Sequence, residues 1–341
     1  MRAVTFEVFG GPEVLRISEV PDPSVGDGEV LIRVEAAGVC HHDILHRSGR
    51  LPNATPGMVL GHEVCGTIDR TGRGATLAAG TKVVAYNRMS CGRCPGCLSG
   101  RHDLCRNSRL LGSTAAGGYA EFLVVPEWAA IPLPPSLPSV EGALAVCPIG
   151  TSVRALWGVG GIGPGDVVLI TGASGGLGVH QIQIAAAVGA RPVAVTSSPE
   201  RGPALAELGA EVIVANADQK LRHAIRGVVG NRGVDVVIEN VTSPTLAETM
   251  WTVRPGGTIV VLGNIDLVDV PINPGLLIER RLGLIGSGNP THADVRRAIA
   301  LIESGRVRPQ VHAVVPFAEA GRAHQLTESR AAIGRVVLSG W

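Results

Sequence analysis

Four cysteines between residues 91 and 105 form the most specific pattern in the sequence. They are Cys91, Cys94, Cys97 and Cys105, with two, two and seven residues between them. Thiolates at this spacing suit a tetrahedral zinc ion, and an iron–sulfur cluster or two disulfides are the alternatives. A metal is favoured over disulfides in a reducing compartment. Because four cysteines fill the coordination shell, we expect a structural zinc that holds together a lobe with few apolar residues.

A second group of potential metal ligands is spread over the first half of the chain. Cys40 stands in the segment GVCHHD, and His62 stands in the segment GHE. A thiolate and an imidazole are ligands that a catalytic zinc prefers, but such a site needs a third protein ligand. Cys147 is the best remaining candidate. Its rival is Cys65, which follows His62 in an apolar strand and which we interpret as a core residue.

Residues 167–178, VVLITGASGGLG, predict a buried strand that runs into a glycine turn. A helix follows over residues 177–188. Backbone N–H groups and the positive end of a helix dipole meet at such a turn and form a site for a phosphate. Ala173 replaces the first glycine of the strict pattern, ahead of Gly175 and Gly178. The turn alone is therefore a weak signal, and a turn without a ligand is the alternative.

Strands and helices alternate after residue 165. The predicted strands cover residues 167–170, 192–196, 211–214, 234–239, 258–262 and 282–285, and a short helix near 246–253 precedes the fifth. Six parallel strands with helices between them predict a doubly wound dinucleotide-binding sheet, an α/β fold. Residues 1–37 instead predict short strands joined by Pro and Gly turns, which indicates a separate domain. We expect the tail to return to that domain with a last strand.

Composition and charge exclude several classes of protein. The chain has 341 residues, 45% of them hydrophobic and 3% aromatic, and a formal net charge of +1. This length allows two ordinary domains, and the absence of a basic cluster argues against a nucleic-acid surface. The N-terminus lacks the apolar core of a signal peptide, and no apolar run predicts a membrane span. We therefore expect a cytoplasmic protein without a nucleic-acid or membrane partner.

These motifs together resemble those of the zinc-containing medium-chain dehydrogenase/reductase family, the family of the zinc alcohol dehydrogenases. The resemblance covers essentially the whole chain. It rests on GVCHHD at 38–43, GHE at 61–63, the four-cysteine lobe, Cys147 and GASGGLG at 172–178.

The resemblance implies a specific division of the chain. Residues 1–147 would form a GroES-like, β-rich catalytic domain, with the structural-zinc lobe at 91–105. Residues 148–286 would form a Rossmann domain with a six-stranded parallel sheet, and residues 287–341 would return to the catalytic domain. It also implies an active site in the cleft between the domains, a small-molecule substrate and a homodimer or homotetramer.

The resemblance also assigns the residues around the catalytic metal. Cys40, His62 and Cys147 match the ligands of the catalytic zinc. Glu63 matches a carboxylate that lies near the metal and sometimes binds it. Asp43 matches the carboxylate that orients the zinc-binding histidine and tunes its basicity.

The cofactor contacts follow in the same way. Thr151 falls where a threonine borders the nicotinamide, so it counts as both a catalytic and a cofactor-binding candidate. Arg335 matches a basic residue that reaches the cofactor pyrophosphate, and a solvated arginine is the alternative. The glycine turn supplies the remaining contacts, from Gly172, Ser174, Gly175, Gly176, Leu177 and Gly178.

His42 departs from the pattern of the alcohol dehydrogenases. They usually place a Ser or Thr here, and its hydroxyl relays the substrate proton. An imidazole, with an unperturbed pKa of about 6.5, could relay or donate a proton itself. A histidine with no proton role is the alternative. The replacement weakens the interpretation as an alcohol dehydrogenase.

The end of the second Rossmann strand bears on the choice of cofactor. It reads VTSS over residues 195–198, with no acidic residue to hold a ribose 2′-hydroxyl. Thr196, Ser197 and Arg201 are the candidate residues there. Because Ser197 and Arg201 can hydrogen-bond a 2′-phosphate, NADP(H) is favoured over NAD(H).

Two oxidoreductase functions fit these residues, and in both a zinc ion acts as a Lewis acid on a substrate oxygen. The first is hydride transfer between NADP(H) and an alcohol/carbonyl pair. The second is NADPH-dependent reduction of an α,β-unsaturated thioester or ketone. It is supported because the glycine turn resembles that of quinone- and enoyl-reducing branches, and the acryloyl-CoA reductase branch combines such a turn with the metal motifs. A zinc-ribbon interaction module and a relative that binds cofactor without catalysis are further alternatives.

Overall fold

The computed structural model describes residues 1–215 and 219–341, which form two compact units. The first unit consists of Met1–Cys147, Thr291–Ile299 and Pro309–Trp341, and the second of Pro148–Pro290 and Ala300–Arg308. The segment expected to return to the first unit is therefore divided, because residues 287–290 and 300–308 pack with the second.

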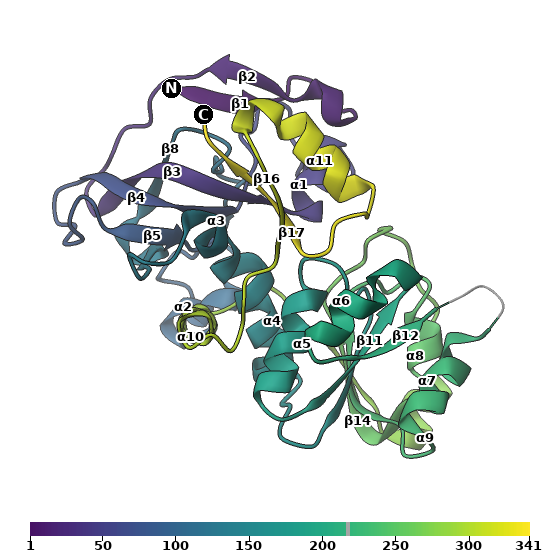
Figure 1. Ribbon diagram of the computed structural model, residues 1–341. Coiled ribbons are helices and arrows are strands. Elements are labelled where there is room, and N and C mark those ends of the chain that lie inside the picture. Colours follow the sequence, from purple (N-terminus) through teal and green to yellow (C-terminus); the bar gives the residue numbers. More distant parts are fainter. Residues whose placement is uncertain (216–218) are drawn as a thin grey trace. The chain divides into compact units, whose positions relative to one another are not determined.

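A seven-stranded sheet forms the centre of the first unit. Its strands are β3 (Glu29–Val39), β4 (Glu63–Thr71), β5 (Lys82–Ala85), β8 (Phe122–Pro126), β9 (Ala130–Pro132), β16 (Val311–Val315) and β17 (Arg335–Ser339). They follow the order β16-β17-β3-β4-β5-β9, and β8 also pairs with β3. All pairs are antiparallel except β16 with β17. The C-terminal strand β17 thus lies beside β3 from the N-terminal part of the chain (Figure 1).

Smaller elements complete the first unit. Two short hairpins pair β1 (Arg2–Thr5) with β2 (Arg16–Glu19) and β6 (Arg88–Met89) with β7 (Arg109–Leu110). The α-helices are α1 (His41–Arg47), α2 (Pro95–Leu98), α3 (Ser139–Gly142) and α11 (Ala320–Glu328), and α10 (His292–Glu303) begins here and ends in the second unit. Helix α1 begins after Cys40 because Asp43 accepts a hydrogen bond from the backbone N–H of Cys40 at 2.9 Å.

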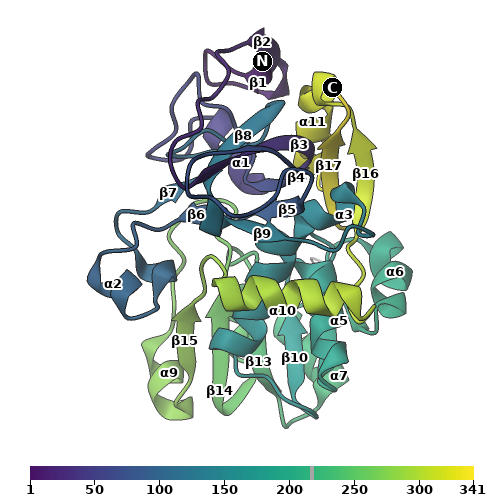
Figure 2. The same cartoon turned by 90° about the vertical axis from the view of Figure 1, so that its left-hand side faces the viewer.

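The second unit contains the six-stranded parallel sheet that the sequence predicts. Its strands are β10 (Val167–Ile170), β11 (Arg191–Thr196), β12 (Glu211–Val214), β13 (Val234–Glu239), β14 (Val253–Val261) and β15 (Gly283–Gly286). They follow the doubly wound order β12-β11-β10-β13-β14-β15, part of which Figure 2 shows from β15 to β10. The predicted fold class is confirmed.

The helices of the second unit follow the strands with one difference from the prediction. They are α4 (Thr151–Val153), α5 (Gly178–Ala187), α6 (Gly202–Glu207), α7 (Leu221–Val229), α8 (Leu246–Thr249) and α9 (Pro274–Arg280). The helix expected to reach Val253 ends at Thr249, and β14 begins at Val253 instead of residue 258. The reason is that Val253 is buried and pairs with Val234 of β13, ahead of a register shift at the Pro-Gly-Gly segment.

One helical segment differs from the expectation of no membrane-length apolar run. Among the described residues, Ser139–Val159 is long and apolar enough to cross a membrane by length and composition. However, 67% of its most apolar window is buried inside the protein, which is typical of a core helix. Leu144, Ile149 and Leu156 on this segment are fully buried. Protein contacts therefore already cover its apolar surface.

Candidate active site

Four side chains from three separate segments of the sequence meet in the first unit. Cys40, His62, Glu63 and Cys147 each offer one ligand atom, and these atoms all lie within 4.8 Å of one another. Cys40 precedes α1, and His62 and Glu63 lie where β4 begins. Cys147 lies on a π-helical turn of residues Val146–Gly150. The structure thus assembles the four residues that the resemblance assigned to the catalytic metal.

Asp43 orients His62 in this cluster. Its fully buried carboxylate accepts hydrogen bonds from the backbone N–H of Cys40 at 2.9 Å, from the backbone N–H of Gly61 at 3.2 Å, and from Nδ1 of His62 at 3.2 Å. An ionised carboxylate only accepts, so Nδ1 carries a proton, and in the neutral imidazole Nε2 keeps its lone pair. That tautomer is the one that can bind a metal through Nε2.

The Asp43–His62 contact also changes two pKa values. Burial alone would raise the pKa of Asp43, but His62 lowers it overall. Burial alone would lower the pKa of His62, but Asp43 and the thiolate of Cys40 raise it well above its usual value. The buried negative charges of Asp43 and Cys40 thus favour a positive charge at this position, such as a metal ion would supply.

The two thiols of the cluster share one negative charge. A hydrogen bond between their sulfurs lowers the pKa of Cys40 well below its usual value and raises that of Cys147 well above it. Two thiolates so close together repel each other unless a cation lies between them. A divalent cation would remove this conflict, because a coordinating thiol is deprotonated outright.

Glu63 is paired with Arg335 inside the first unit. Oε1 of Glu63 lies 2.9 Å from Nη2 of Arg335, and the carboxylate is fully buried. Burial raises the pKa of Glu63 to about 7, although Arg335 opposes this change. Arg335 was expected at the cofactor pyrophosphate, but the structure places its guanidinium on Glu63, because a buried cation needs a buried anion. Its role toward the cofactor stays a prediction.

The residues of this cluster fit a zinc ion. They offer two sulfurs, one imidazole nitrogen and one carboxylate oxygen, which is a donor set that zinc prefers. Both oxygens of Glu63 are buried and accept no hydrogen bond of good geometry among the described residues, although Arg335 lies close. A bound cation would satisfy them. Cys65, the rival ligand, is fully buried in β4, where burial raises the pKa of its thiol to about 12.

His42 lies beside the cluster on α1. Its ring centroid is 5.4 Å from that of His62 at an interplanar angle of 88°, and 4.7 Å from that of His46. Burial and the nearby His62 lower its pKa, so the ring is neutral at neutral pH. The sequence analysis did not single out His46, which is almost completely buried and whose pKa burial lowers to about 4. The four-residue spacing of His42 and His46 could have indicated that the two rings lie on the same face of one helix.

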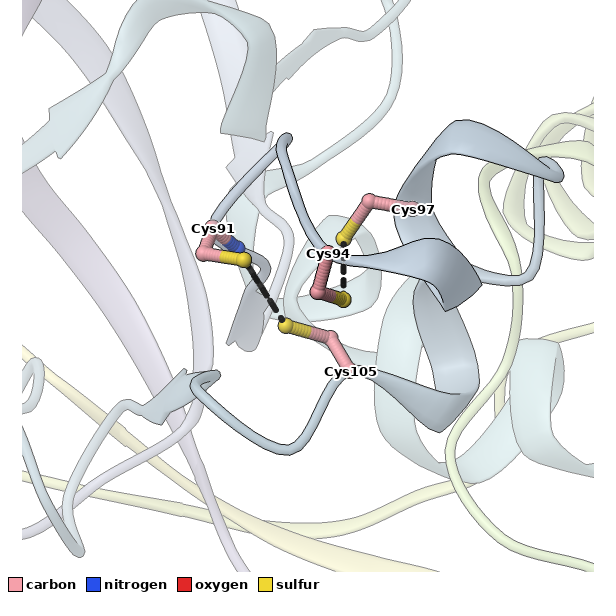
Figure 3. A group of neighbouring side chains, drawn as sticks. All are labelled: Cys91, Cys94, Cys97 and Cys105. Atoms are coloured by element: carbon pink, nitrogen blue, oxygen red, sulfur yellow. Dashed lines mark hydrogen bonds between the residues drawn. The ribbon is translucent and has the colours of Figure 1, made fainter.

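The four cysteines of the lobe form a second compact cluster. The sulfurs of Cys91, Cys94, Cys97 and Cys105 also lie within 4.8 Å of one another, and all seven cysteines of the chain are free thiols. Figure 3 shows the four side chains pointing toward one centre, with 3.5 Å between the sulfurs of Cys91 and Cys105 and between those of Cys94 and Cys97. This arrangement fits a closed Cys₄ zinc site that leaves no position for a substrate.

The glycine turn of the second unit explains why Ala173 is tolerated. Gly172 has a φ of +58°, which suits glycine, whereas Ala173 is fully buried and donates its N–H to the carbonyl of Val195. A Cβ on Gly178 would lie 2.5 Å from the backbone of Ala173. The close approach of α5 to the turn therefore depends on Gly178. Gly175, Gly176 and Leu177 connect the turn to α5.

Side chains expected at the adenosine ribose also meet in the second unit. Nη1 of Arg201 donates to Oγ of Ser174 at 3.0 Å. Thr196 ends β11, and its hydroxyl accepts a hydrogen bond from the N–H of Ser198, beside the exposed Ser197. Polar and cationic groups thus gather where the sequence lacks an acidic residue. Thr151 begins α4 in the same unit, and its expected place at the nicotinamide stays a prediction.

Comparison with known proteins identifies the family. Residues 26–135 match the model of the alcohol dehydrogenase GroES-like domain, and residues 176–304 match that of the zinc-binding dehydrogenases. The chain belongs to the zinc-containing medium-chain dehydrogenase/reductase family and is an oxidoreductase.

Three relatives extend this comparison. An acryloyl-coenzyme A reductase of Sulfurisphaera tokodaii is 30% identical, over 99% of both chains. An NAD-dependent alcohol dehydrogenase of the same organism is 32% identical, again over 99% of both chains. Among solved structures, the crystal structure of AibC is 40% identical, with a TM-score of 0.94 over 100% of this chain and 96% of that one.

The Asp43 contact leads to a testable prediction. Asp43→Asn should lower the affinity of the Cys40 cluster for zinc by about 10- to 100-fold, because the amide cannot accept all three N–H groups and no longer favours the metal-binding tautomer. Chelator competition measures this affinity. Asp69→Asn, which changes an aspartate at the surface of β4, should leave it unchanged. Equal affinities of the two variants would contradict the assignment of Asp43.

Proposed function

We propose that this protein reduces the carbon–carbon double bond of an α,β-unsaturated acyl thioester with a hydride from NADPH. The observation that carries the proposal is His42. Its imidazole lies beside His62, with 5.4 Å between the ring centroids, where an alcohol dehydrogenase usually has a hydroxyl. The likeness to a protein named acryloyl-coenzyme A reductase supports it.

The reaction balances without a further reactant. NADPH gives a hydride to the β-carbon and leaves as NADP⁺, a proton from water adds to the α-carbon, and the thioester carbonyl is retained. A zinc ion held by Cys40, His62 and Cys147 would supply Lewis-acid polarisation of that carbonyl. His42 would donate an N–H hydrogen bond toward the oxygen on which negative charge develops. Asp43 would keep His62 in its metal-binding tautomer.

A second candidate is oxidation or reduction of an alcohol/carbonyl pair, which the likeness to a protein named NAD-dependent alcohol dehydrogenase favours. Oxidation of NADPH and NADH against matched saturated aldehydes and α,β-unsaturated acyl thioesters separates the two. We expect turnover of the thioesters with NADPH and a saturated thioester as product. Turnover of aldehydes alone would overturn the proposal. The Cys147→Ser variant provides the background rate.

NADP(H) is the cofactor in this proposal. The supporting observation is the contact of Arg201 with Ser174, near the end of β11. Arg201→Ala should raise the KM for NADPH by about tenfold through loss of one charge-assisted phosphate contact, and should leave the KM for NADH unchanged. Arg191→Ala, which removes an exposed arginine paired with Glu211, is the matched control. An equal change in both KM values would assign Arg201 to a purely structural role.

Cytoplasmic location and a homodimer or homotetramer, as in the sequence analysis, stay predictions.

A further inference from the structure

A groove of about 750 Å³ lies on the first unit, and none of the eight candidate metal ligands lines it. Five segments meet there. They are the loop residues 76–77, the 3₁₀ turn Glu127–Ala129, strand β9, the first turns of α10, and the 3₁₀ turn His102–Leu104 of the cysteine lobe. Its volume lies in the range typical of small-molecule sites.

Aromatic rings form one wall of this groove. The indole of Trp128 is 43% exposed, an unusual state for the largest side chain. Its ring centroid lies 5.5 Å from that of His292, which lies 4.3 Å from that of the buried Tyr86. Burial, together with the nearby Arg296, lowers the pKa of His292 to about 4, so its ring is neutral. The rings of this wall carry no charge, and the wall can therefore stack on a flat ring of a ligand.

A free cation stands next to this wall. Arg296 lies one helical turn after His292 on α10 and is exposed, and it forms no ion pair with any described residue. Glu127, the carboxylate that lines the groove, accepts hydrogen bonds from the backbone N–H groups of Thr76 and Leu77. These N–H groups stabilise its ionised form and partly offset its negative charge within the groove. An aromatic wall with an adjacent arginine suits a purine that carries a phosphate.

We propose that this groove binds the 3′-phosphoadenosine end of a coenzyme A thioester, with the purine on Trp128 and a phosphate on Arg296. This inference rests on the proposed reduction of an acyl thioester. It specifies coenzyme A as the carrier of the acyl group.

The register of the sheet places the groove near the metal cluster. Val64 pairs with Ala85, so Glu63, which precedes Val64, and Tyr86, which follows Ala85, are next in register. Ala85 in turn pairs with Ala130 of β9. Tyr86 therefore lies one strand spacing from the strand that carries Glu63, and Trp128, which precedes β9, lies about two strand spacings, roughly 10 Å, from it. The long flexible pantetheine arm of coenzyme A can connect two such sites.

Calorimetry with adenosine 3′,5′-bisphosphate tests the groove directly. Saturating NADP⁺ in the cell blocks the cofactor site of the second unit. We expect binding that weakens about tenfold in Arg296→Gln and in Trp128→Leu, through loss of a phosphate contact and of stacking respectively. Arg297→Gln, which changes the neighbouring exposed arginine outside the groove, should bind as the unaltered protein does. Equal binding by all four proteins, or equal binding of 5′-AMP, would overturn the inference.

A kinetic comparison separates this inference from the proposed function. Arg296→Gln should raise the KM for a coenzyme A thioester about tenfold and leave kcat unchanged, and it should not change the KM for the same acyl group on N-acetylcysteamine. An unchanged KM for both thioesters, with turnover intact, would overturn the groove alone. Absence of thioester turnover in the unaltered protein would instead overturn the proposed function.

Discussion

Replacing Cys147 with serine is expected to abolish catalysis while the fold persists. A serine hydroxyl does not ionise near neutral pH, so the cluster of Cys40, His62, Glu63 and Cys147 loses one of its two thiolates. The zinc content should fall by one ion per chain, and kcat/KM should fall about a thousandfold or more, because Lewis-acid stabilisation contributes several kcal/mol to the barrier. Metal analysis and steady-state kinetics on the same sample measure both quantities.

Cys65→Ser is the matched control for this experiment. Cys65 is a fully buried thiol of β4, three residues from His62, and it does not belong to the cluster. The control should keep both zinc ions and its activity, at some cost in stability. Full activity of Cys147→Ser, or loss of the same ion in Cys65→Ser, would reject Cys147 as the ligand that joins Cys40 and His62. Either result would favour Cys65 in its place.

Replacing Cys94 with serine should instead damage the structure around the lobe. The lobe consists of short turns, and its cysteines point toward one centre (Figure 3). Because the binding energy of a structural zinc is folding energy, loss of one ligand should unfold residues 91–105. We expect loss of one zinc ion per chain, a decrease in melting temperature of more than about 5 °C, and early proteolysis within the lobe.

The control for the lobe is Leu98→Ser, which changes a side chain that is 78% exposed on α2 of the same lobe. It should keep the metal content and the melting temperature. If Cys94→Ser also melted at the unaltered temperature with two zinc ions bound, the four cysteines would not form a structural site.

The local features of this protein could be predicted from the sequence because they depend on neighbouring residues. Strands β10, β12 and β13 begin and end as predicted, since each is a short, largely apolar segment between turn residues. The four-cysteine cluster needed only spacing, because its ligands lie within fifteen positions. The start of α1 also depends on neighbouring residues, because Asp43 accepts a hydrogen bond from the backbone N–H of Cys40, three residues away.

Where local signals compete, the prediction was less accurate. The helix expected up to Val253 ends at Thr249, and Val253 begins β14 instead. Pairing with Val234 buries Val253, and this outweighs the weak helical preference of the segment. The apolar segment Ser139–Val159 could not be assigned to the core from composition, since burial is a property of its surroundings.

The sequence by itself determined the family motifs, the parallel sheet and the kinds of ligand available to two metal sites. Only the tertiary structure decided which distant side chains meet. It placed Arg335 on Glu63 through the pairing of β17 with β3, and it placed Arg296 of α10 in one groove with the exposed Trp128. The physical reason is that sequence spacing limits contacts over a few residues. Contacts across the chain depend on strand register and on the burial of charge, which only the folded protein sets.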